Sequence, residues 1–336
     1  MNKNGICVAG NMIVDILYPV NGLPKPGELT SIEEGITRAT GGALCNVIGD
    51  LAIMDHSLPL TALGRVGTDS EGEYILETLR GYKNIDLSMI KREGKTSFTA
   101  VMADQVSKER TFFHYRGANA RFCEEDIDWD KIKANFLHIG YILLLDSLDM
   151  EDDGYGTKMA RLLCNAQQRG IKTSLDVVSE IGDRFKRLVP PALKYADYCI
   201  INEIEAGQVT GVSLRDDMGN LKTANIPLAL EKIKKLGVSQ WAVIHCPEGG
   251  YGLDGSGRFV ESPSIKLPPD YIKGTVGAGD AFCAGTIYAA FHGESLEEGL
   301  ELGNAAAAAS LSMPGSTEGM LPVKELRNFR KLLSKS

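Results

Sequence analysis

The stretch that decides the fold is Gly-Thr-Val-Gly-Ala-Gly-Asp-Ala-Phe at residues 274–282, which begins the helical run 278–292. Gly277 and Gly279 let backbone N–H groups approach one point at a helix start, where unpaired amides and the helix dipole favour an anion. The stretch therefore predicts a phosphate-binding turn. A carboxylate beside a phosphate is unfavourable unless it handles a proton or faces a metal, so Asp280 favours phosphoryl transfer over phosphate binding alone.

Taken alone, the same stretch is also compatible with an ordinary glycine turn, in which Asp280 is a first-turn acid favoured by the helix dipole. It differs from the dinucleotide-binding fingerprint, because Phe282 stands where that motif requires glycine and the turn lies far from the first strand. The sequence contains no Gly-x-x-x-x-Gly-Lys-Ser/Thr run. A nucleotide-dependent phosphotransferase with this sequence is therefore not of the P-loop kind.

Working back from the turn, the chain alternates between short apolar runs and amphipathic helical runs. Strands are expected at 136–140, 173–177, 198–201 and 241–245, and helices at 155–169, 183–193, 204–210 and 228–236. Such alternation predicts a parallel sheet covered by helices on both faces. Two short strands near Gly255 precede the turn, and helices 296–311 and 323–333 follow it.

The amino-terminal third adds core elements and a second, smaller sheet. The expected elements are strands at 6–10, 28–32 and 60–64, helices at 47–54 and 71–80, and a hairpin of 98–102 with 110–115. Residues 18–37 are rich in proline and glycine, and with the hairpin they predict a small separate sheet. Asn11 and Asp15 follow the first strand, where polar groups at a strand's carboxyl end suit a ligand.

Composition and charge exclude several classes of partner. The 336 residues are 43% hydrophobic, which suits one sizeable α/β domain with a small appendage. The net charge of −8, with cations spread among acids, excludes a basic face for nucleic acid or a membrane surface. Seven cysteines without a Cys-x-x-Cys pair predict buried thiols in a reducing compartment and no metal ligation by sulfur. Since no apolar run is long enough to cross a bilayer, we expect a cytoplasmic protein.

A second polar group, Asn202-Glu203-Ile204-Glu205, follows an apolar strand at the expected ligand-binding edge of the sheet. In one interpretation Asn202 caps a helix and the two glutamates occupy its first turn. In the other, Asn202 and Glu205 bind water molecules around Mg²⁺, an ion that keeps most of its hydration shell and prefers oxygen ligands. The sequence leaves both interpretations open.

A third group consists of Gly41, Gly42 and Asn46, together with Asp15. Two glycines before a helix can be a turn and a close strand–helix contact, and nothing more. Yet Asn46 lies one helical turn beyond Gly42, so its amide can point back at a ligand that approaches the glycine backbone. Asp15 can accept hydrogen bonds from two neighbouring hydroxyls at once. This combination is typical of polyol binding.

These motifs, in this order, resemble those of the ribokinase/PfkB family of carbohydrate kinases. The resemblance covers nearly the whole chain. It includes Gly-Gly-x-x-x-Asn at Gly41, Gly-Arg-Val-Gly-Thr-Asp at Gly64, Asn-x-x-Glu at Asn202 and Gly-Ala-Gly-Asp-Ala-Phe at Gly277. Each motif is weak alone, whereas their conjunction at these spacings is specific.

Membership would imply a kinase dependent on ATP and Mg²⁺ that phosphorylates a small monosaccharide. The implied fold is one ribokinase-like α/β domain over residues 1–336, with three layers (α/β/α) around a mostly parallel sheet. A small β lid over the sugar is also implied, and residues 17–39 and 96–116 match it. In several family members such lids pair to form a homodimer.

The resemblance further implies roles for individual residues. Asp280 looks like the catalytic base, and Gly277, Ala278 and Gly279 look like the anion hole. Sugar contacts match Asn11, Asp15, Gly41, Gly42 and Asn46; nucleotide contacts match Asn202, Thr275, Gly277, Gly279 and Asn304; and Glu205 matches a contact to Mg²⁺ through water. For Asn304, plain helix packing is an equal alternative. We expect the helix start to lower the pKa of Asp280, which is tolerable because the proton leaves late in phosphoryl transfer.

Three departures from the family pattern bear on ligands. Gly274 stands where the family commonly has an aspartate of its monovalent-cation site, which makes activation by K⁺ doubtful. His245-Cys246-Pro247 replaces a Thr-x-Gly at the nucleotide edge, so a purine triphosphate other than ATP stays open. Ala43 replaces a lysine of some ribokinases, which weakens the case for ribose.

Arg116 is the main clue to the substrate. It is either a solvated lid charge or a bidentate ligand for a carboxylate or phosphate, as in a 2-keto-3-deoxygluconate-like sugar acid. A neutral sugar is favoured here, because no second cation is evident beside Arg116. A nucleoside kinase of the same fold is an alternative enzyme, and a sugar or nucleotide sensor is the alternative that is not an enzyme.

Overall fold

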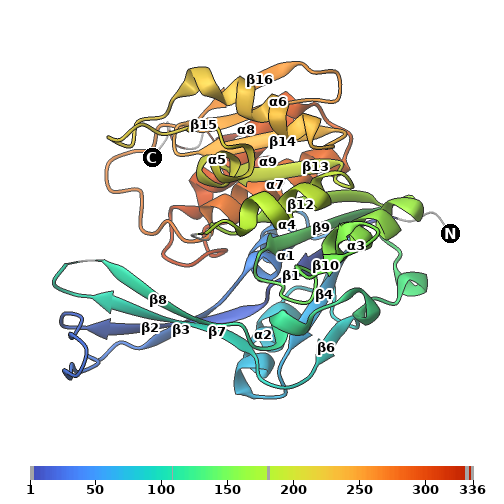
Figure 1. Ribbon diagram of the computed structural model, residues 1–336. Helices are drawn as coiled ribbons and strands as arrows, with labels where there is room; N and C mark the ends of the chain where they lie inside the picture. The colour runs from blue at the N-terminus through green and yellow to red at the C-terminus, as the bar shows by residue number, and fades with distance from the viewer. Residues whose placement is uncertain (1–3, 108, 180–181, 330–332, 334–336) are drawn as a thin grey trace.

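The computed structural model describes residues 4–107, 109–179, 182–329 and 333. A large central sheet lies between two layers of helices, and a smaller sheet projects from one side of it (Figure 1). The mostly parallel strands of the large sheet alternate in sequence with the helices that cover it. The predicted α/β class with a second, smaller sheet is therefore confirmed.

The central sheet has the strand order β16-β15-β14-β13-β12-β9-β1-β4-β5, with β6 paired beside β4. Its strands are β1 (Ile6–Gly10), β4 (Leu60–Val66), β5 (Ile85–Asp86), β6 (Ile90–Arg92), β9 (Phe136–Ile142), β12 (Lys172–Val177), β13 (Tyr198–Asn202), β14 (Trp241–Cys246), β15 (Gly249–Leu253) and β16 (Phe259–Pro263). From β5 to β14 every pairing is parallel, and β14, β15 and β16 pair antiparallel. The carboxyl ends of the central parallel strands therefore meet at one edge.

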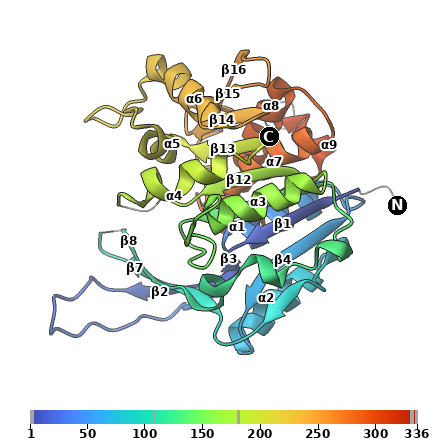
Figure 2. The same cartoon turned by 45° about the vertical axis from the view of Figure 1, so that its right-hand side comes forward.

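Two hydrophobic clusters fill the two faces of the central sheet, and each lies between the sheet and one layer of helices. One cluster joins the sheet to α1 (Ala43–Met54), α2 (Ser70–Arg80), α7 (Ala278–Phe291) and α8 (Leu296–Ser310). The other joins it to α3 (Lys158–Gln168), α4 (Arg184–Leu193), α5 (Glu203–Thr210) and α6 (Ile226–Lys235). Figure 2 shows α3 and α4 lying across the near face of the sheet. Burial on both faces explains why the strands read as continuous apolar runs.

The smaller sheet has the order β3-β2-β7-β8 and consists of β2 (Ile13–Val20), β3 (Thr37–Gly41), β7 (Ser97–Asp104) and β8 (Arg110–Tyr115). The predicted hairpin is confirmed as the antiparallel pair β7–β8. The prediction of a strand at 28–32 is wrong, because that segment makes only a single bridge, from Ile32 to Val20. Pro24, Pro26 and Gly27 precede it, and prolines lack the N–H that a strand ladder needs. The paired strands instead lie on either side, so the sheet extends beyond the expected 17–39 boundaries to Ile13 and Gly41.

Several boundaries also differ from those expected. Helix α1 begins at Ala43 rather than at residue 47, directly after Gly42, whose φ of 88° ends the preceding strand. The predicted helix 323–333 is found as α9 (Val323–Leu326), and part of its carboxyl end lies outside the described residues. Short elements complete the chain: β10 (Glu151–Asp152), β11 (Gly156–Thr157), and 3-10 turns at Gly117–Arg121, Glu124–Asp126, Trp129–Lys131 and Thr223–Asn225. Within the described ranges, no helix has the length and apolar character that a membrane span requires.

Candidate active site

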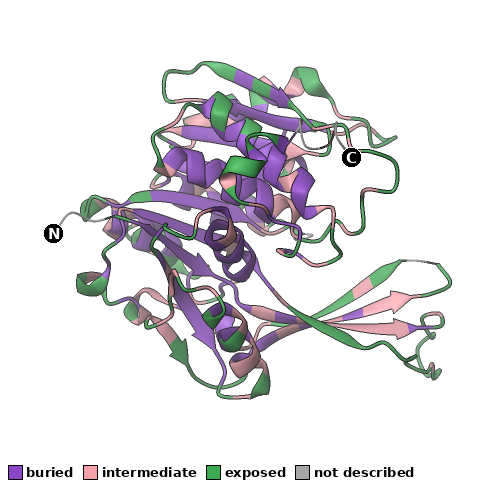
Figure 3. Cartoon of the chain, turned by 180° about the vertical axis from the view of Figure 1, so that it is seen from behind, coloured by how far each residue is buried: buried purple, intermediate pink, exposed green. Residues whose placement is uncertain are grey.

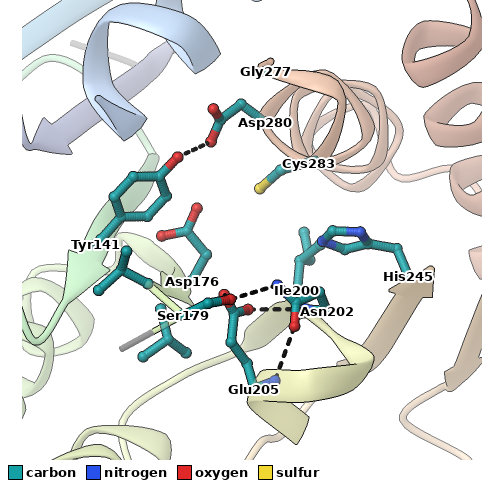
Figure 4. A pocket seen from close by; sticks show the side chains of 13 residues that line it. Tyr141, Asp176, Ser179, Ile200, Asn202, Glu205, His245, Gly277, Asp280 and Cys283 are labelled. Carbon is teal, nitrogen blue, oxygen red and sulfur yellow. Dashed lines mark hydrogen bonds between the residues drawn. The ribbon is translucent and has the colours of Figure 1, made fainter. Parts of the chain in front are cut away.

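A pocket of about 260 Å³ lies where the carboxyl ends of β9, β12, β13 and β14 meet the start of α7 (Figure 4). Tyr141, Asp176, Asn202 and His245 come from these four strands, and Asp280 comes from the helix. The volume is slightly below the range of about 300–1,000 Å³ that is usual for whole organic ligands. The pocket therefore suits reacting groups and an ion better than complete substrates.

The glycine turn begins helix α7 as the sequence predicts. Gly277 is the N-cap residue with φ 79°, and a side chain there would collide with Ser316, because an added Cβ would lie 2.6 Å from the Cβ of Ser316. Gly277 and Gly279 both line the pocket. Thr275 is exposed and does not line it, although its carbonyl accepts a hydrogen bond of 3.5 Å from Ala278 N.

Asp280 lies in the first turn of α7 with only 7% of its surface exposed. Its two carboxylate oxygens accept from different donors: Tyr141 Oη donates to Oδ1 at 2.7 Å and Asn46 Nδ2 donates to Oδ2 at 2.7 Å. These hydrogen bonds come from two separate elements, β9 and α1. The carboxylate is therefore held in one orientation by the fold itself.

The expected low pKa of Asp280 is wrong. Burial and then the neighbouring Asp176 carboxylate raise the pKa of Asp280 to about 6, although hydrogen bonds from Asn46 and Tyr141 act to lower it. A helix start favours the charged form, but here the loss of water and a second acid outweigh that effect. Asp280 is therefore a stronger base than a surface aspartate and still mostly ionised at neutral pH.

The residues matched to sugar contacts around the start of α1 already contact other protein groups. Asn46 donates to Asp280, and its Oδ1 accepts from Ser316 Oγ at 2.8 Å, so its amide lies against the base. Gly41 packs against the Asp15 carboxylate. Burial raises the pKa of Asp15, while a hydrogen bond from Thr99 lowers it.

Asn11, which follows β1, packs against Gly42, the residue before α1. Gly42 needs its lack of a side chain, because an added Cβ would lie 2.6 Å from the Asn11 carbonyl oxygen. Asn11 Oδ1 accepts from Tyr141 N at 3.1 Å, whereas its buried Nδ2 has no hydrogen-bond partner in the described part of the chain. An unpartnered buried donor is unfavourable, so this amide is available to a ligand.

Asn202 and Glu205 form a reciprocal capping box at the start of α5. Asn202 Oδ1 accepts from the backbone N–H groups of Ile204 and Glu205, and Glu205 Oε2 accepts from Asn202 N at 2.9 Å. Ser179 Oγ donates to Glu205 Oε1 at 2.9 Å. Burial raises the pKa of Glu205 to about 8. The helix-capping interpretation is therefore confirmed, and because both residues also line the pocket, a ligand role stays a prediction.

Sequence reasoning missed Tyr141 and Asp176. Tyr141 holds Asp280, and Asp176 lies between Asp280 and Glu205 in the pocket (Figure 4). Burial raises the pKa of Asp176 well above its ordinary value, and its Oδ1 has no hydrogen-bond partner among the residues described. Each lies near the carboxyl end of a predicted strand, and that position was the signal that could have found them.

Two predicted ligand residues lie elsewhere. Asn304 is buried in α8 and donates to Ser262 and Pro263 at β16, so it matches the helix-packing alternative. Arg116 Nη1 donates to the Leu143 carbonyl at 2.6 Å and pairs with Asp146.

The expectation that no second cation lies beside Arg116 is wrong. Arg184 Nη1 donates to the same carbonyl, that of Leu143, at 3.2 Å. Arg184 also pairs with Asp149 at 3.3 Å. The two arginines come from segments far apart in the chain, so their sequence spacing gave no sign of this proximity.

Comparison with known proteins agrees with this architecture. Residues 3–324 match the model of the pfkB family of carbohydrate kinases, so the chain belongs to that family. It is 26% identical to an Arabidopsis thaliana ribokinase over 332 residues, which covers 97% of this chain and 81% of that protein. It is 22% identical to an Escherichia coli 2-dehydro-3-deoxygluconokinase, with coverage of 86% of this chain and 93% of that one. The predicted class, a carbohydrate kinase, is therefore confirmed.

Solved structures share the fold. A structure of Arabidopsis thaliana ribokinase complexed with ribose and ATP aligns with a TM-score of 0.80 and 22% identity, covering 98% of this chain and 99% of that one. A Methanocaldococcus jannaschii nucleoside kinase aligns over 100% of both chains with a TM-score of 0.73 and 17% identity. The ribokinase-like fold is thus established, and the same fold occurs in kinases with different acceptors.

Proposed function

We propose that this protein transfers the γ-phosphoryl group of ATP to a hydroxyl of a small monosaccharide, with Asp280 as the general base. The observation that carries the proposal is the Asp280 carboxylate, which is buried at a glycine-rich helix start and held by Tyr141 and Asn46. In the reaction, the sugar oxygen bonds to the γ-phosphorus, the bond from that phosphorus to the ADP oxygen breaks, and the hydroxyl proton passes to Asp280. A pKa of about 6 leaves the base ionised at neutral pH and able to accept that proton.

The start of α7 supports the developing charge. Gly277, Ala278 and Gly279 would direct backbone N–H groups at the transferred phosphoryl group, as an anion hole. Sugar contacts by Asn11, Asp15, Gly41 and Gly42 stay predictions, supported by the free Asn11 amide and the packing of Asp15 on Gly41. Asn46 would act mainly on Asp280. Nucleotide contacts by Asn202 and Thr275 also remain predictions.

Mg²⁺ fits the acidic side of the pocket. Asp176, Glu205 and Asp280 all have raised pKa values because they are buried with too few compensating groups, and Asp176 Oδ1 lacks a partner among the described atoms. A divalent cation would offset that charge. Glu205 would help to hold this ion through water, and the ion would supply positive charge that offsets the charge of the phosphate groups.

The substrate is proposed to be a neutral sugar, because Arg116 and Arg184 are each already paired with an aspartate, and an acidic sugar is the second candidate. The acidic candidate is favoured by Arg184, which shares the Leu143 carbonyl with Arg116, and by the 2-dehydro-3-deoxygluconokinase relatives. A nucleoside acceptor is a weaker alternative, supported by relatives with that name.

The small sheet is proposed to act as the lid and to pair with a second copy. Its β8 strand leaves Phe112, Phe113 and Tyr115 63%, 57% and 45% exposed. Exposed apolar patches of this kind mark contact sites. A homodimer through this sheet and a cytoplasmic location are predictions of the proposal.

The test is an ADP-release screen with Mg-ATP against neutral hexoses and pentoses, sugar acids, sugar phosphates and nucleosides. The proposal expects one strong acceptor, with turnover lost in Asp280→Asn. ATP binding without turnover of any acceptor would favour a sensor. Arg116→Gln then separates the candidates: for an acidic acceptor KM should rise about 10–100-fold, while Arg121→Gln, a neighbouring exposed arginine, leaves KM unchanged.

A further inference from the structure

Beside the pocket, three residues of types that bind transition metals face one another. His138 lies on β9, Asp176 on β12 and Cys283 on α7, and one ligand atom of each lies within 4.8 Å of the other two. His138 Nε2 is 3.6 Å from Asp176 Oδ2 and 3.8 Å from Cys283 Sγ. All three residues are buried. The proposed phosphoryl transfer uses neither His138 nor Cys283.

The distance from His138 Nε2 to Asp176 Oδ2 suits metal ligands better than a hydrogen bond, whereas the contact of His138 Nε2 with Cys283 Sγ suits either. An N–H···O hydrogen bond normally spans about 2.7–3.2 Å between heavy atoms. Ligand atoms around a tetrahedral Zn²⁺ lie about 3.3–3.8 Å apart, since the bonds to nitrogen, oxygen and sulfur are about 2.0–2.3 Å long. Two of the three spacings fall in that range. The third spacing is between Asp176 and Cys283. Asp176 Oδ1 has no hydrogen-bond partner among the described residues, so the carboxyl group can rotate and shorten this spacing without losing a hydrogen bond.

A supporting residue fixes the histidine ring. Ser174 Oγ lies 3.0 Å from His138 Nδ1, and both residues are completely buried. This hydrogen bond leaves Nε2 directed at Asp176 and Cys283. Histidines that bind metals usually have their other ring nitrogen held in this way, and the contact sets the orientation of the ring.

The cluster can be reached from the pocket. Asp176 and Cys283 are among the residues that line it. Figure 4 shows the Cys283 sulfur and the Asp176 carboxylate both directed into the cavity, between Asp280 and Glu205. A cation that enters the pocket would therefore meet two of the three ligands at its wall.

We propose that His138, Asp176 and Cys283 form a binding site for a zinc-class divalent cation on the core side of the pocket, with its fourth position open to the cavity. The donors select the ion, because imidazole and thiolate favour Zn²⁺ or Co²⁺, whereas Mg²⁺ prefers oxygen. The site does not depend on the proposed kinase reaction. The proposal differs from the expectation that sulfur binds no metal here. That expectation considered only nearby cysteines, whereas Cys283 meets a histidine 145 residues away.

The test is titration of the intact protein with Co²⁺ in the presence of excess Mg²⁺. The expected result is a sulfur-to-cobalt charge-transfer band that saturates at one equivalent. Cys283→Ser should lose the band. Cys45→Ser is the matched control, since Cys45 is 3% and Cys283 2% exposed, and this variant should keep the band.

Absence of the band in the wild type, or its survival in Cys283→Ser, would overturn the proposal. Should Cys283→Ser fail to fold by circular dichroism, calorimetric titration with Zn²⁺ of two further variants decides. His138→Gln should abolish stoichiometric binding, and Ser174→Ala should weaken it about tenfold. Unchanged Zn²⁺ affinity in both variants would exclude this cluster as the site.

Discussion

The pocket at the edge of the central sheet and the smaller sheet beside it are built in opposite ways. In the pocket, Asp280, Asn202 and Glu205 already have hydrogen-bond partners within the chain. In the smaller sheet, large apolar side chains such as Phe112 and Phe113 face solvent. Figure 3 shows the contrast, with buried residues concentrated in the main body and intermediate or exposed ones along the projecting strands.

This difference indicates how each region works. A reacting carboxylate must keep one orientation, and hydrogen bonds from separate elements hold it without help from a ligand. Aromatic rings exposed on a sheet gain further stabilisation when a partner covers them. The pocket is therefore expected to lose activity when Asp280 itself is replaced and to change its pH dependence when a partner is removed, and the smaller sheet is expected to lose assembly while the fold survives.

The largest expected effect is at the centre of the pocket. Asp280→Asn should cut turnover by roughly 10²–10⁴-fold, because the proposed general base is removed, with little change in ATP affinity. Steady-state kinetics and ATP titration measure the two effects. Asp197→Asn alters an aspartate of similar burial, 6% against 7% exposed, and should keep normal turnover per folded molecule. Near-normal turnover of folded Asp280→Asn would remove it from the role of base.

Asp50 provides a second test, because it is a buried acid that lacks the partners that Asp280 has. It is completely buried in α1, and neither of its oxygens has a hydrogen-bond partner in the described ranges. Burial, and then the Asp280 carboxylate, raise the pKa of Asp50 well above its ordinary value. The contribution of Asp50 to stability is therefore full below its unfolded pKa, about 3.9, and is lost as the pH rises toward its folded pKa.

Asp50→Asn should consequently raise the free energy of unfolding by about 1–3 kcal/mol near neutral pH, with a smaller gain in acid. Urea unfolding at about pH 5 and about pH 7.5 measures this difference. No gain at the higher pH would mean that a bound group, such as an ion, compensates Asp50 in solution.

Glu205→Gln should raise the Mg²⁺ concentration needed for half-maximal activity about tenfold, because the charge toward the ion is lost. Glu203→Gln is the control on the same helix turn, since Glu203 pairs with Arg215 instead. Titration of activity with Mg²⁺ measures both. An unchanged requirement in Glu205→Gln would leave helix capping as its only role.

Tyr141→Phe should lower kcat/KM at neutral pH only a few-fold and move the acid limb of the pH profile upward from about 6. The reason is that the Tyr141 hydrogen bond lowers the pKa of Asp280, so its loss lets burial raise that pKa further. Tyr288→Phe removes another tyrosine–aspartate hydrogen bond, to Asp55, and should leave the profile in place. A profile that does not move would show that Tyr141 does not tune the base.

The smallest effect on stability is expected in the smaller sheet. Phe113→Ser should change the free energy of unfolding by less than about 0.5 kcal/mol, because this ring is more than half exposed. It should nevertheless weaken the proposed dimer, as measured by sedimentation velocity. Thr111→Ser, on the same strand, is the mild control. A wild-type protein that is monomeric at all concentrations would show that another contact covers this surface.

Much of this protein was determined by local sequence. Apolar periodicity, glycine turns and capping residues predicted nearly all the core strands and helices, because these signals act within a few residues. The family motifs placed Asp280 and Glu205 in one pocket. The strand expected at 28–32 was wrong, since alternation alone cannot show whether a proline-rich segment finds a pairing partner.

Only the tertiary structure decided the surroundings of these residues. Tyr141, Asp176 and His138 meet helix α7 because their strands end or lie side by side in the sheet, and strand order is not written in local periodicity. The pKa of Asp280 rose rather than fell for the same reason, since burial and the Asp176 carboxylate are properties of the packed site. Local sequence thus determines the elements and the turn, whereas the electrostatics and partners of the site depend on contacts between residues far apart in the chain.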